Sequence, residues 1–416
     1  MIRNSVKSFL VAIIIICYIL SGFSSDVSAN PSSQTIISQD TQLHIYTYDS
    51  LLAEPFYDIK GNFTEYSGIV DIKITKFPDA NSILTTLMLD KAEGRNEADV
   101  VIGIDNALIH SIENISELLE PYTPTNISQI NDTLIENLDP DHYLIPYDFG
   151  IIALWYQNQV VNSTTNPELT NLTLETLLES DLLSMLIVEN PKLSSPGLGF
   201  LLWTIAVYGD PLINFKGLLD DDWRNWWDKS KSDIIITKSW GDAWTLFSET
   251  SEEKPIMVSY GTSPAYGFCQ WADNTSSAVV THENDTKNAW LQIEGIGLVK
   301  NAPHKDNAKE FIDWFLGEEL QSELPEHQWM YPANTEVNVS DCFKEASIAP
   351  SEVNPLNNLL PPAMLKKHLV NWQDQWEQVA VKKSIPGFDI PIVISSFMAI
   401  VFYAMLISRK KKKLSQ

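Results

Sequence analysis

The sequence contains few basic residues, few cysteines and few histidines. Lysine and arginine number 28 against 54 aspartates and glutamates, so the formal net charge of the 416 residues is -26. A surface of this sign repels phosphate backbones, which argues against a nucleic-acid partner. Three cysteines are too few for a disulfide scaffold in a chain of this length, and seven histidines leave little material for a zinc site.

Motifs of the common enzyme classes are also missing. The sequence has no Gly-X-Ser-X-Gly elbow, no paired-histidine metal motif and no nucleotide-binding loop, and its histidines are scattered along the chain. We therefore expect no catalytic residues, no metal and no cofactor, and we predict that the protein is not an enzyme.

Long apolar runs occur at both ends of the chain. The run at 9–20 follows Arg3 and Lys7 and precedes small and polar residues. This order of basic, apolar and small residues is typical of a secretory signal, so we predict a signal peptide at 1–29.

The C-terminal run predicts a membrane anchor. Residues 390–408 form an apolar segment just long enough to cross a bilayer, after a linker at 384–389 and before a basic tail at 409–416. Because basic tails stay on the cytoplasmic side, we expect a cell-surface protein, held at the extracellular face of the membrane by a single-pass C-terminal helix.

Two further features fit an extracellular location. Asn-X-Ser/Thr triplets occur roughly twice as often as chance would give, which predicts a glycoprotein. They begin at Asn62, Asn114, Asn126, Asn131, Asn162, Asn171, Asn274, Asn284 and Asn338. Cys269 and Cys342 either pair in an oxidising compartment or are two isolated buried residues.

Short β-branched runs alternate with longer amphipathic stretches, which indicates α/β architecture. We predict strands at 43–48, 71–77, 99–104, 182–189, 234–237 and 255–260, helices at 54–67, 82–93, 198–208 and 359–383, and a loop at 338–358. In open α/β sheets ligands bind at the carboxyl ends of the strands, so the polar residues that follow these strands are candidate contacts.

The helix at 198–208 has a start suited to an anion. Ser195 is a good N-cap, Pro196 suits the first helical position, and Gly209 ends the helix. The hydroxyls of Ser194 and Ser195, with the free backbone N–H groups that follow, would form a cradle for a phosphate or another anion. The alternative is an ordinary capped helix.

Aromatic residues are abundant, with 13 tryptophans and 14 tyrosines. Several lie at the ends of predicted strands or shortly after them, namely Tyr48, Trp240, Tyr260, Tyr266 and Trp329. Aromatic faces at the ligand side of an acidic protein suit a flat cationic ring, because each face attracts a cation. The alternative is that these rings belong to the core.

A series of motifs resembles the thiamine-binding proteins of bacterial ABC importers, which are two-lobed type II periplasmic binding proteins. The motifs run in the family's order: YTYDS at 46–50, ADVVIGIDN at 98–106, PYDFG at 146–150, SPGLG at 195–199, LLW at 201–203, VYGD at 207–210, TKSW at 237–240, SY at 259–260, TSPAY at 262–266 and WMYP at 329–332. The resemblance spans residues 43–381.

The resemblance implies a set of ligand contacts. They are Asp79, Ala80, Ser194, Ser195, Trp240, Tyr260, Gly261, Thr262 and Ser263, with Tyr48, Tyr266 and Trp329 as further ring contacts. Ala80 stands where the family pattern has Gly, and Gly261 stands where it commonly has Thr. Ala80 would resist a positive φ, and Gly261 lacks a hydroxyl.

We therefore expect a two-lobed α/β fold of the type II periplasmic-binding-protein kind, with a hinge, an interlobe ligand cleft and a C-terminal transmembrane helix. The first lobe would comprise 41–149, the second 150–285, and 286–383 would return to the first lobe and end in a helix. The protein would bind thiamine or a thiamine phosphate and deliver it to an ABC permease and its ATPase. The alternatives are a binder of ferric iron or of another cationic heterocycle, and an anchored extracellular enzyme or adhesin.

Overall fold

The first part of the sheet consists of parallel strands covered by helices. The computed structural model describes residues 42–52 and 57–381. Strand β1 (Gln42–Tyr48) pairs in parallel with β2 (Asp71–Phe77) on one side and with β3 (Val100–Asp105) on the other. All residues of β3 are buried, as expected of a central parallel strand with both faces covered.

The second part of the sheet has the same construction around a different core. Strand β6 (Leu186–Glu189) lies between β7 (Ile235–Thr237) and β8 (Ile256–Tyr260) and is parallel to both. Helix α5 (Ser195–Tyr208) follows β6 and is apolar along its whole length, because it is covered on all sides.

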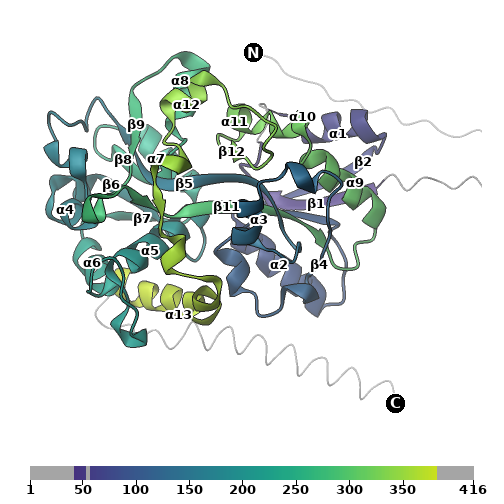
Figure 1. The fold of residues 1–416 in the computed structure, drawn as a ribbon, viewed down its shortest axis with the longest axis horizontal. Helices are drawn as coiled ribbons and strands as arrows, with labels where there is room; N and C mark the ends of the chain where they lie inside the picture. Colours follow the sequence, from purple (N-terminus) through teal and green to yellow (C-terminus); the bar gives the residue numbers. More distant parts are fainter. Residues whose placement is uncertain (1–41, 53–56, 382–416) are drawn as a thin grey trace, which may run out of the picture. The chain divides into compact units, whose positions relative to one another are not determined.

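Two long strands join the two parts. Strand β5 (Ile145–Gln157) runs antiparallel both to β11 (Leu291–Val299) and to β8, so the strand order is β2-β1-β3-β11-β5-β8-β6-β7. Figure 1 shows β5 and β11 crossing the middle of the molecule. Their two ends belong to different cores, which makes them the natural hinge of a two-lobed protein.

The remaining elements are short strands and covering helices. The strands are β4 (Leu119–Glu120), β9 (Ser276–Val279), β10 (Asn288–Ala289), β12 (Tyr331–Pro332) and β13 (Asn354–Pro355). The helices are α1 (Ile59–Ser67), α2 (Ala80–Ala92), α3 (Asp132–Leu138), α4 (Leu174–Glu179), α6 (Trp223–Ser230), α7 (Trp240–Glu249), α8 (Pro264–Trp271), α9 (Lys305–Phe315), α10 (Glu318–Gln321), α11 (Leu324–His327), α12 (Asp341–Ala346) and α13 (Pro362–Ala380).

The buried side chains form two large apolar cores. The first is built mainly from residues 43–147 and 293–333, and the second mainly from residues 151–290 and 353–380. Two cores that share the strands β5 and β11 confirm the predicted two-lobed α/β fold. The predicted lobe boundaries stay predictions, and α13 packs with the second core.

Three local predictions differ from the structure. Strand β6 begins at Leu186, because the residues before it form a 3-10 turn at Asp181–Met185. Ser194, and not Ser195, caps α5. The segment predicted as a loop contains α12, which is too short to show helical periodicity and is joined to α8 by a disulfide between Cys269 and Cys342.

The predicted transmembrane helix is not part of this fold. Within residues 42–52 and 57–381, no helix is long and apolar enough to cross a membrane. This finding contradicts the C-terminal helix that we included in the predicted fold. The segments at 1–29, 384–389, 390–408 and 409–416, which carry the predicted signal peptide, linker, membrane span and tail, lie outside the described residues.

Candidate ligand-binding site

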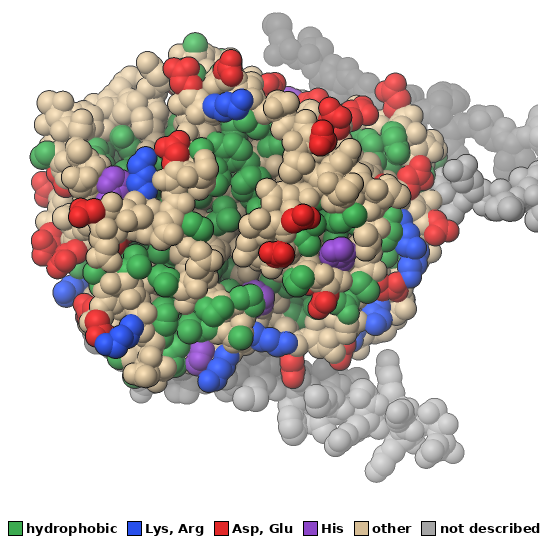
Figure 2. Space-filling view, viewed as in Figure 1, with side chains coloured by type: hydrophobic (Ala, Val, Ile, Leu, Met, Phe, Trp, Pro, Cys, Tyr) green, Lys and Arg blue, Asp and Glu red, His purple; other side chains and the backbone are tan. Residues whose placement is uncertain are grey.

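A cavity of about 280 Å³ lies between the two cores, at the carboxyl ends of the parallel strands. Its lining comes from β1, β3 and the start of α2 in one part, and from α5, α7, β8 and α8 in the other. Hydrophobic side chains gather in the central hollow of the face shown in Figure 2. The cavity approaches the volume of small-molecule sites in proteins, so it suits a ligand of one or two rings.

One side of the cavity, which we call the aromatic wall, consists of Trp155, Trp240, Trp244, Tyr260 and Tyr266. Helix α7 supplies two of these rings from one face, since Trp240 and Trp244 are four residues apart. The indole Nε1 of Trp240 donates a hydrogen bond to Ser259 Oγ at 2.9 Å, which holds its ring at the cavity.

The rings of the aromatic wall rest on further aromatic contacts. The ring of Trp155 packs on Phe247 with centroids 4.6 Å apart, in a small apolar cluster beneath α7. Tyr266 meets Trp329 edge to face at 5.4 Å. Trp329 has a φ of 60°, a left-handed backbone that a bulky residue rarely adopts and that is often found at ligand sites.

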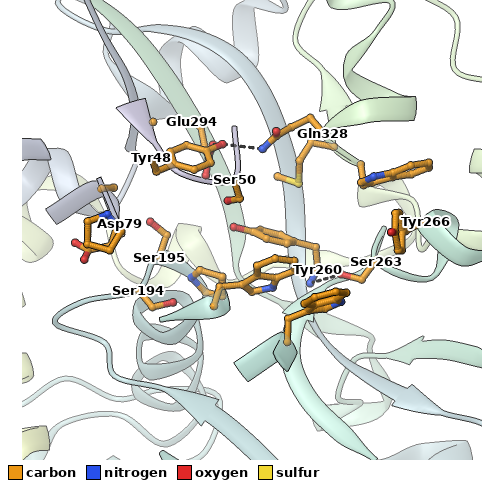
Figure 3. A pocket seen from close by; sticks show the side chains of 18 of the residues that line it. Tyr48, Ser50, Asp79, Ser194, Ser195, Tyr260, Ser263, Tyr266, Glu294 and Gln328 are labelled. Atoms are coloured by element: carbon orange, nitrogen blue, oxygen red, sulfur yellow. Dashed lines mark hydrogen bonds between the residues drawn. The ribbon is translucent and has the colours of Figure 1, made fainter. Parts of the chain in front are cut away.

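The opposite side, which we call the polar wall, is formed by Tyr48, Ser50, Asp79, Glu294 and Gln328 (Figure 3). Tyr48 Oη accepts a hydrogen bond from Gln328 Nε2 at 2.7 Å and donates one to Glu294 Oε2 at 2.7 Å.

A glycine makes room for the tyrosine of the polar wall. Gly103 has a φ of 107°, and a Cβ at that position would come within 2.4 Å of the Tyr48 ring. Only glycine therefore lets this ring lie against β3.

A chain of hydrogen bonds runs across the floor of the cavity from one wall to the other. Gln292 Nε2 donates to Glu294 Oε1 at 2.7 Å and to Tyr260 Oη at 2.9 Å. Because Tyr48 also donates to Glu294, the carboxylate lies between the tyrosines of the two walls. Burial raises the pKa of Glu294 to about 7.

The starts of two helices face each other at one end of the cavity. Asp79 caps α2 by accepting a hydrogen bond from Ser82 N at 2.7 Å, and Ser194 caps α5. Asn81 Nδ2 donates to the Lys192 carbonyl at 2.9 Å, so the two helix starts touch.

Ser195 contributes a second contact across the same end of the cavity, because its hydroxyl donates to the buried carboxylate of Asp105 on β3. Burial raises the pKa of Asp105, although the hydrogen bond from Ser195 opposes this shift.

The cavity brings together most of the predicted contact residues. Its lining contains Tyr48, Asp79, Ala80, Ser194, Ser195, Trp240, Tyr260, Ser263, Tyr266 and Trp329. Gly261 and Thr262 are not in the lining. The assignment of individual residues as ligand contacts stays a prediction.

The structure explains the two departures from the family pattern. A Cβ at position 261 would lie 2.8 Å from Ile151, so packing and not ligand contact accounts for Gly261. Its neighbour Thr262 is fully buried. Ala80 is the first residue of α2 and is not among the residues with positive φ, so the expected resistance of alanine to that conformation has no consequence here.

Several lining residues escaped the sequence analysis. They are Ser50, Trp155, Trp244, Glu294, His327, Gln328 and Met330. Trp244 could have been predicted from the sequence, because it follows Trp240 by about one helical turn and so lies on the same face of the helix. Gln292 and Glu294 could also have been predicted, since they are alternate polar residues in a strand that is otherwise apolar.

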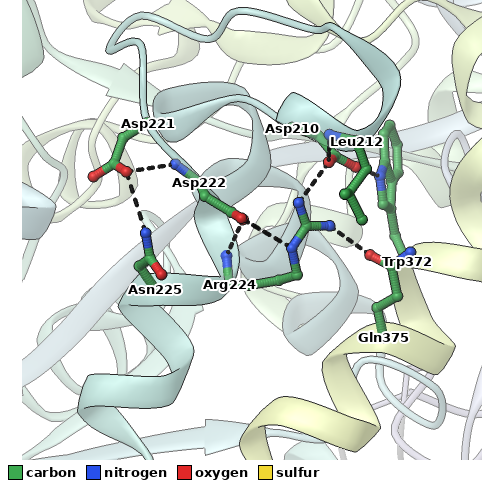
Figure 4. A network of polar contacts seen from close by, with 8 residues as sticks. All are labelled: Asp210, Leu212, Asp221, Asp222, Arg224, Asn225, Trp372 and Gln375. Atoms are coloured by element: carbon green, nitrogen blue, oxygen red, sulfur yellow. Dashed lines mark hydrogen bonds and ion pairs between the residues drawn. The ribbon is translucent and has the colours of Figure 1, made fainter.

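One motif of the resemblance serves the fold and not the cavity. Asp210, which ends VYGD, is fully buried and accepts hydrogen bonds from Arg224 Nη2 at 2.7 Å and from Trp372 Nε1 at 2.8 Å (Figure 4). Arg224 Nη1 also donates to Gln375 at 2.6 Å, which ties α13 to α6. Burial would raise the pKa of Asp210, but the bonds from Arg224 and Trp372 outweigh it and hold the pKa below its ordinary value.

Comparison with known families gives a clear result. Residues 49–322 match the bacterial extracellular solute-binding protein family, which is more than half of the chain. The chain belongs to this family. The family membership confirms the prediction of a solute-binding protein that is not an enzyme.

Relatives at the level of sequence carry the name thiamine-binding periplasmic protein. The protein from Brucella melitensis is 28% identical over 337 residues, which cover 80% of this chain and 91% of the relative. The protein from Escherichia coli is 28% identical over 345 residues, covering 81% and 92%. The resemblance drawn from the motifs is thereby confirmed.

Solved structures show the same architecture. A periplasmic thiamin binding protein superposes with a TM-score of 0.66 at 26% identity, covering 82% of this chain and 96% of that one. A ferric binding protein from Campylobacter jejuni superposes with a TM-score of 0.60 at 17% identity, covering 81% and 99%. The second likeness concerns the fold alone.

The predicted location has to be corrected. The relatives are named as periplasmic proteins, and no helix within the described ranges 42–52 and 57–381 could span a membrane. A cell-surface location with a single-pass C-terminal anchor is therefore contradicted, and with it the membrane as a partner through that helix.

Proposed function

We propose that this solute-binding protein captures thiamine, or a thiamine phosphate, and delivers it to an ABC permease. One observation carries the proposal: the cavity combines a wall of five aromatic rings with two carboxylates, Asp79 and Glu294, and no lysine or arginine is present among its described lining residues. Such a site favours a flat, positively charged ring system over an anionic or an uncharged one.

The geometry suggests how thiamine would bind. The thiazolium and pyrimidine rings would lie against the aromatic wall, where each ring face contributes about 0.5 to 2 kcal/mol when the cation is partly desolvated. The hydroxyethyl group, or a phosphate on it, would lie at the start of α5, near the hydroxyls of Ser194 and Ser195.

Release would require the two lobes to separate. The contacts that bridge the lobes near the cavity include Asn81 to Lys192 and Ser195 to Asp105. Both lie at the starts of α2 and α5, so opening about β5 and β11 would break them and expose the ligand to the permease.

The tyrosines argue against the ferric-iron alternative. Burial, with the nearby carboxylates Glu294 and Asp148, raises the pKa of Tyr48, Tyr147 and Tyr260 well above the ordinary value. Iron-binding tyrosines lose their protons when the metal binds, and the raised pKa values in the metal-free protein add to the free energy that this step requires. Among the described residues, no group of three or more histidines, cysteines, aspartates or glutamates could hold a metal.

Calorimetry of the full chain with thiamine, its monophosphate and its diphosphate tests the proposal. We expect saturable one-to-one binding of at least one of the three, and no product on prolonged incubation. Absence of binding by all three forms would overturn the proposal. Iron found in the purified protein would favour the ferric alternative, and turnover of the ligand would favour an enzyme.

A further inference from the structure

The polar wall of the cavity holds a carboxylate, Glu294, that forms no ion pair with a cation among the described residues. Glu294 is 5% exposed, and its Oε2 accepts hydrogen bonds from Tyr48 at 2.7 Å and from Tyr147 at 2.5 Å, while Oε1 accepts one from Gln292 at 2.7 Å. All three donors are uncharged. Neutral donors stabilise a buried carboxylate only in part, and the charge still favours a positive partner.

The strands on both sides of Glu294 carry further acidic residues. Asp105 on β3 and Asp148 on β5 are its direct partners in the antiparallel register. Asp148 is fully buried, and neither of its carboxylate oxygens has a hydrogen-bond partner among the described residues. Buried carboxylates on neighbouring strands repel one another, which disfavours the ionisation of all three at once.

The other groups that face Glu294 are also acidic or neutral. They are Tyr48 from β1, Tyr147 from β5, Tyr260 from β8 and Gln328 after α11. His327 lines the cavity but is paired with Glu323 at 3.0 Å, and α3 and α9, which also pack on β11, place no residue in the lining. None of the described residues that face Glu294 supplies a positive charge, so a ligand in the cavity would be its source.

We propose that Glu294 is the counter-charge by which this protein selects a cationic ligand over an uncharged one of the same shape, and that binding drives a proton from this carboxyl group into solvent. This inference rests on the proposed function, because it assigns the ligand to the cavity. Glu294 is a specificity-determining residue, and Asp148 is its neighbour on strand β5.

The direction of the pH dependence follows from the two carboxyl groups. Burial raises the pKa of Glu294 to about 7, and burial followed by repulsion from Glu294 raises the pKa of Asp148 well above its ordinary value. Below pH 7 Glu294 is therefore protonated in the empty cavity. A cation held beside it favours the ionised form, so binding releases a proton and becomes tighter as the pH rises through 7.

The wild-type test is calorimetry of the full chain with thiamine at pH 6, 7 and 8, in buffers of different ionisation enthalpy. A single coupled group with a pKa near 7 predicts an affinity about tenfold higher at pH 8 than at pH 6. It also predicts release of close to one proton at pH 6 and of almost none at pH 8. The uncharged thiamine analogue with thiophene in place of thiazolium should bind more weakly, with no proton released.

Three variants sharpen the test. Glu294→Gln keeps the size of the side chain and should lose about tenfold or more in thiamine affinity at pH 8, together with the proton release and the preference for thiamine over the thiophene analogue. Asp148→Asn is a further control, because the raised pKa of Asp148 keeps this carboxyl group uncharged, and it should leave the thiamine affinity at pH 8 and the midpoint of the pH profile unchanged. Glu283→Gln is the matched control, since Glu283 is a buried carboxylate with neutral partners outside the cavity lining, and it should change neither property.

The outcomes separate this inference from the proposed function. Thiamine affinity that is independent of pH, without proton release and with the same preference over the thiophene analogue in Glu294→Gln, would overturn the inference and leave the function in place. Absence of binding by every thiamine form overturns both. Should Glu294→Gln fail to fold, the wild-type proton count and the comparison of thiamine with the thiophene analogue decide the matter.

Discussion

The aromatic wall and the polar wall of the cavity differ in how their side chains are held. The rings of the aromatic wall rest largely on apolar packing, as Trp155 does on Phe247. The side chains of the polar wall hold one another through hydrogen bonds, from Gln328 to Tyr48 to Glu294. The aromatic wall therefore offers a ligand contact area, while the polar wall offers it a charge and polar groups in fixed positions.

The largest effect should come from the aromatic wall. Trp240→Ala removes the ring that begins α7 and should weaken thiamine binding by about 1 to 3 kcal/mol, since a central indole contributes most where it is desolvated. Calorimetry measures the change, with Tyr66→Ala as a control because Tyr66 is an exposed ring outside the cavity lining. Unchanged affinity in Trp240→Ala would remove the aromatic wall from the binding site.

Gly261→Ala tests where the aromatic wall ends. The added Cβ would meet Ile151 at 2.8 Å, so we expect a loss of about 1 to 2 kcal/mol in the free energy of unfolding with thiamine affinity retained. Chemical denaturation and calorimetry measure the two quantities. Gly241→Ala is the matched control, since a Cβ there would have no neighbour nearer than 3.8 Å, and it should leave stability unchanged or higher. A higher thiamine affinity in Gly261→Ala would place this residue in the cavity after all.

Tyr48→Phe tests the polar wall. The variant keeps the ring and removes the hydroxyl that joins Gln328 to Glu294, so we expect thiamine binding to weaken by about 1 kcal/mol. Tyr122→Phe provides the control, because it removes a hydroxyl bonded to Asp313 far from the cavity lining. If Tyr48→Phe equalled or exceeded the loss in Trp240→Ala, the division between area and geometry would be wrong.

Glu189→Gln contrasts a second buried acid with Glu294. Glu189 ends β6 and is not in the cavity lining, and neither of its carboxylate oxygens has a partner among the described residues. Burial raises its pKa well above 4.5, so the folded state keeps a proton that the unfolded state loses, and stability falls as the pH rises above 4.5. The variant should therefore gain stability over wild type at pH 8 relative to pH 5, measured by thermal unfolding. A change in the pH dependence of thiamine binding would show instead that Glu189 acts on the cavity.

The two walls also differ in how far the sequence could predict them. Three rings of the aromatic wall, Trp240, Tyr260 and Tyr266, were within reach, because they lie at or after strand ends on the ligand edge and match motifs such as TKSW and TSPAY. The polar wall was missed in large part, because Glu294 and Gln328 come from segments that are more than two hundred residues away from Tyr48. Their role depends on which strands pair, and the pairing of β11 with β3 and β5 brings together parts of the chain that no local pattern connects.

The fold was predicted well where elements are long and periodic. Strands β1, β2 and β3 and helix α5 lie close to their predicted bounds. Helix α12 could not be predicted, because six residues show no helical period and its position depends on a covalent bond to α8. The predicted N-cap of α5 was wrong by one residue. Ser194 and Ser195 are equally good caps by residue type, and in the structure the hydroxyl of Ser195 donates to Asp105 instead.

The disulfide between Cys269 and Cys342 has a practical consequence for every binding measurement. It joins two cysteines that are 73 residues apart in the sequence and thereby links α8, which carries Tyr266, to α12. Dithiothreitol or a similar reductant would break this link without reaching either core, and the position of α8 with Tyr266 would then depend on non-covalent contacts alone. Samples for calorimetry should therefore be prepared without reductant. A comparison of reduced with oxidised protein would show how much of the thiamine affinity depends on the disulfide.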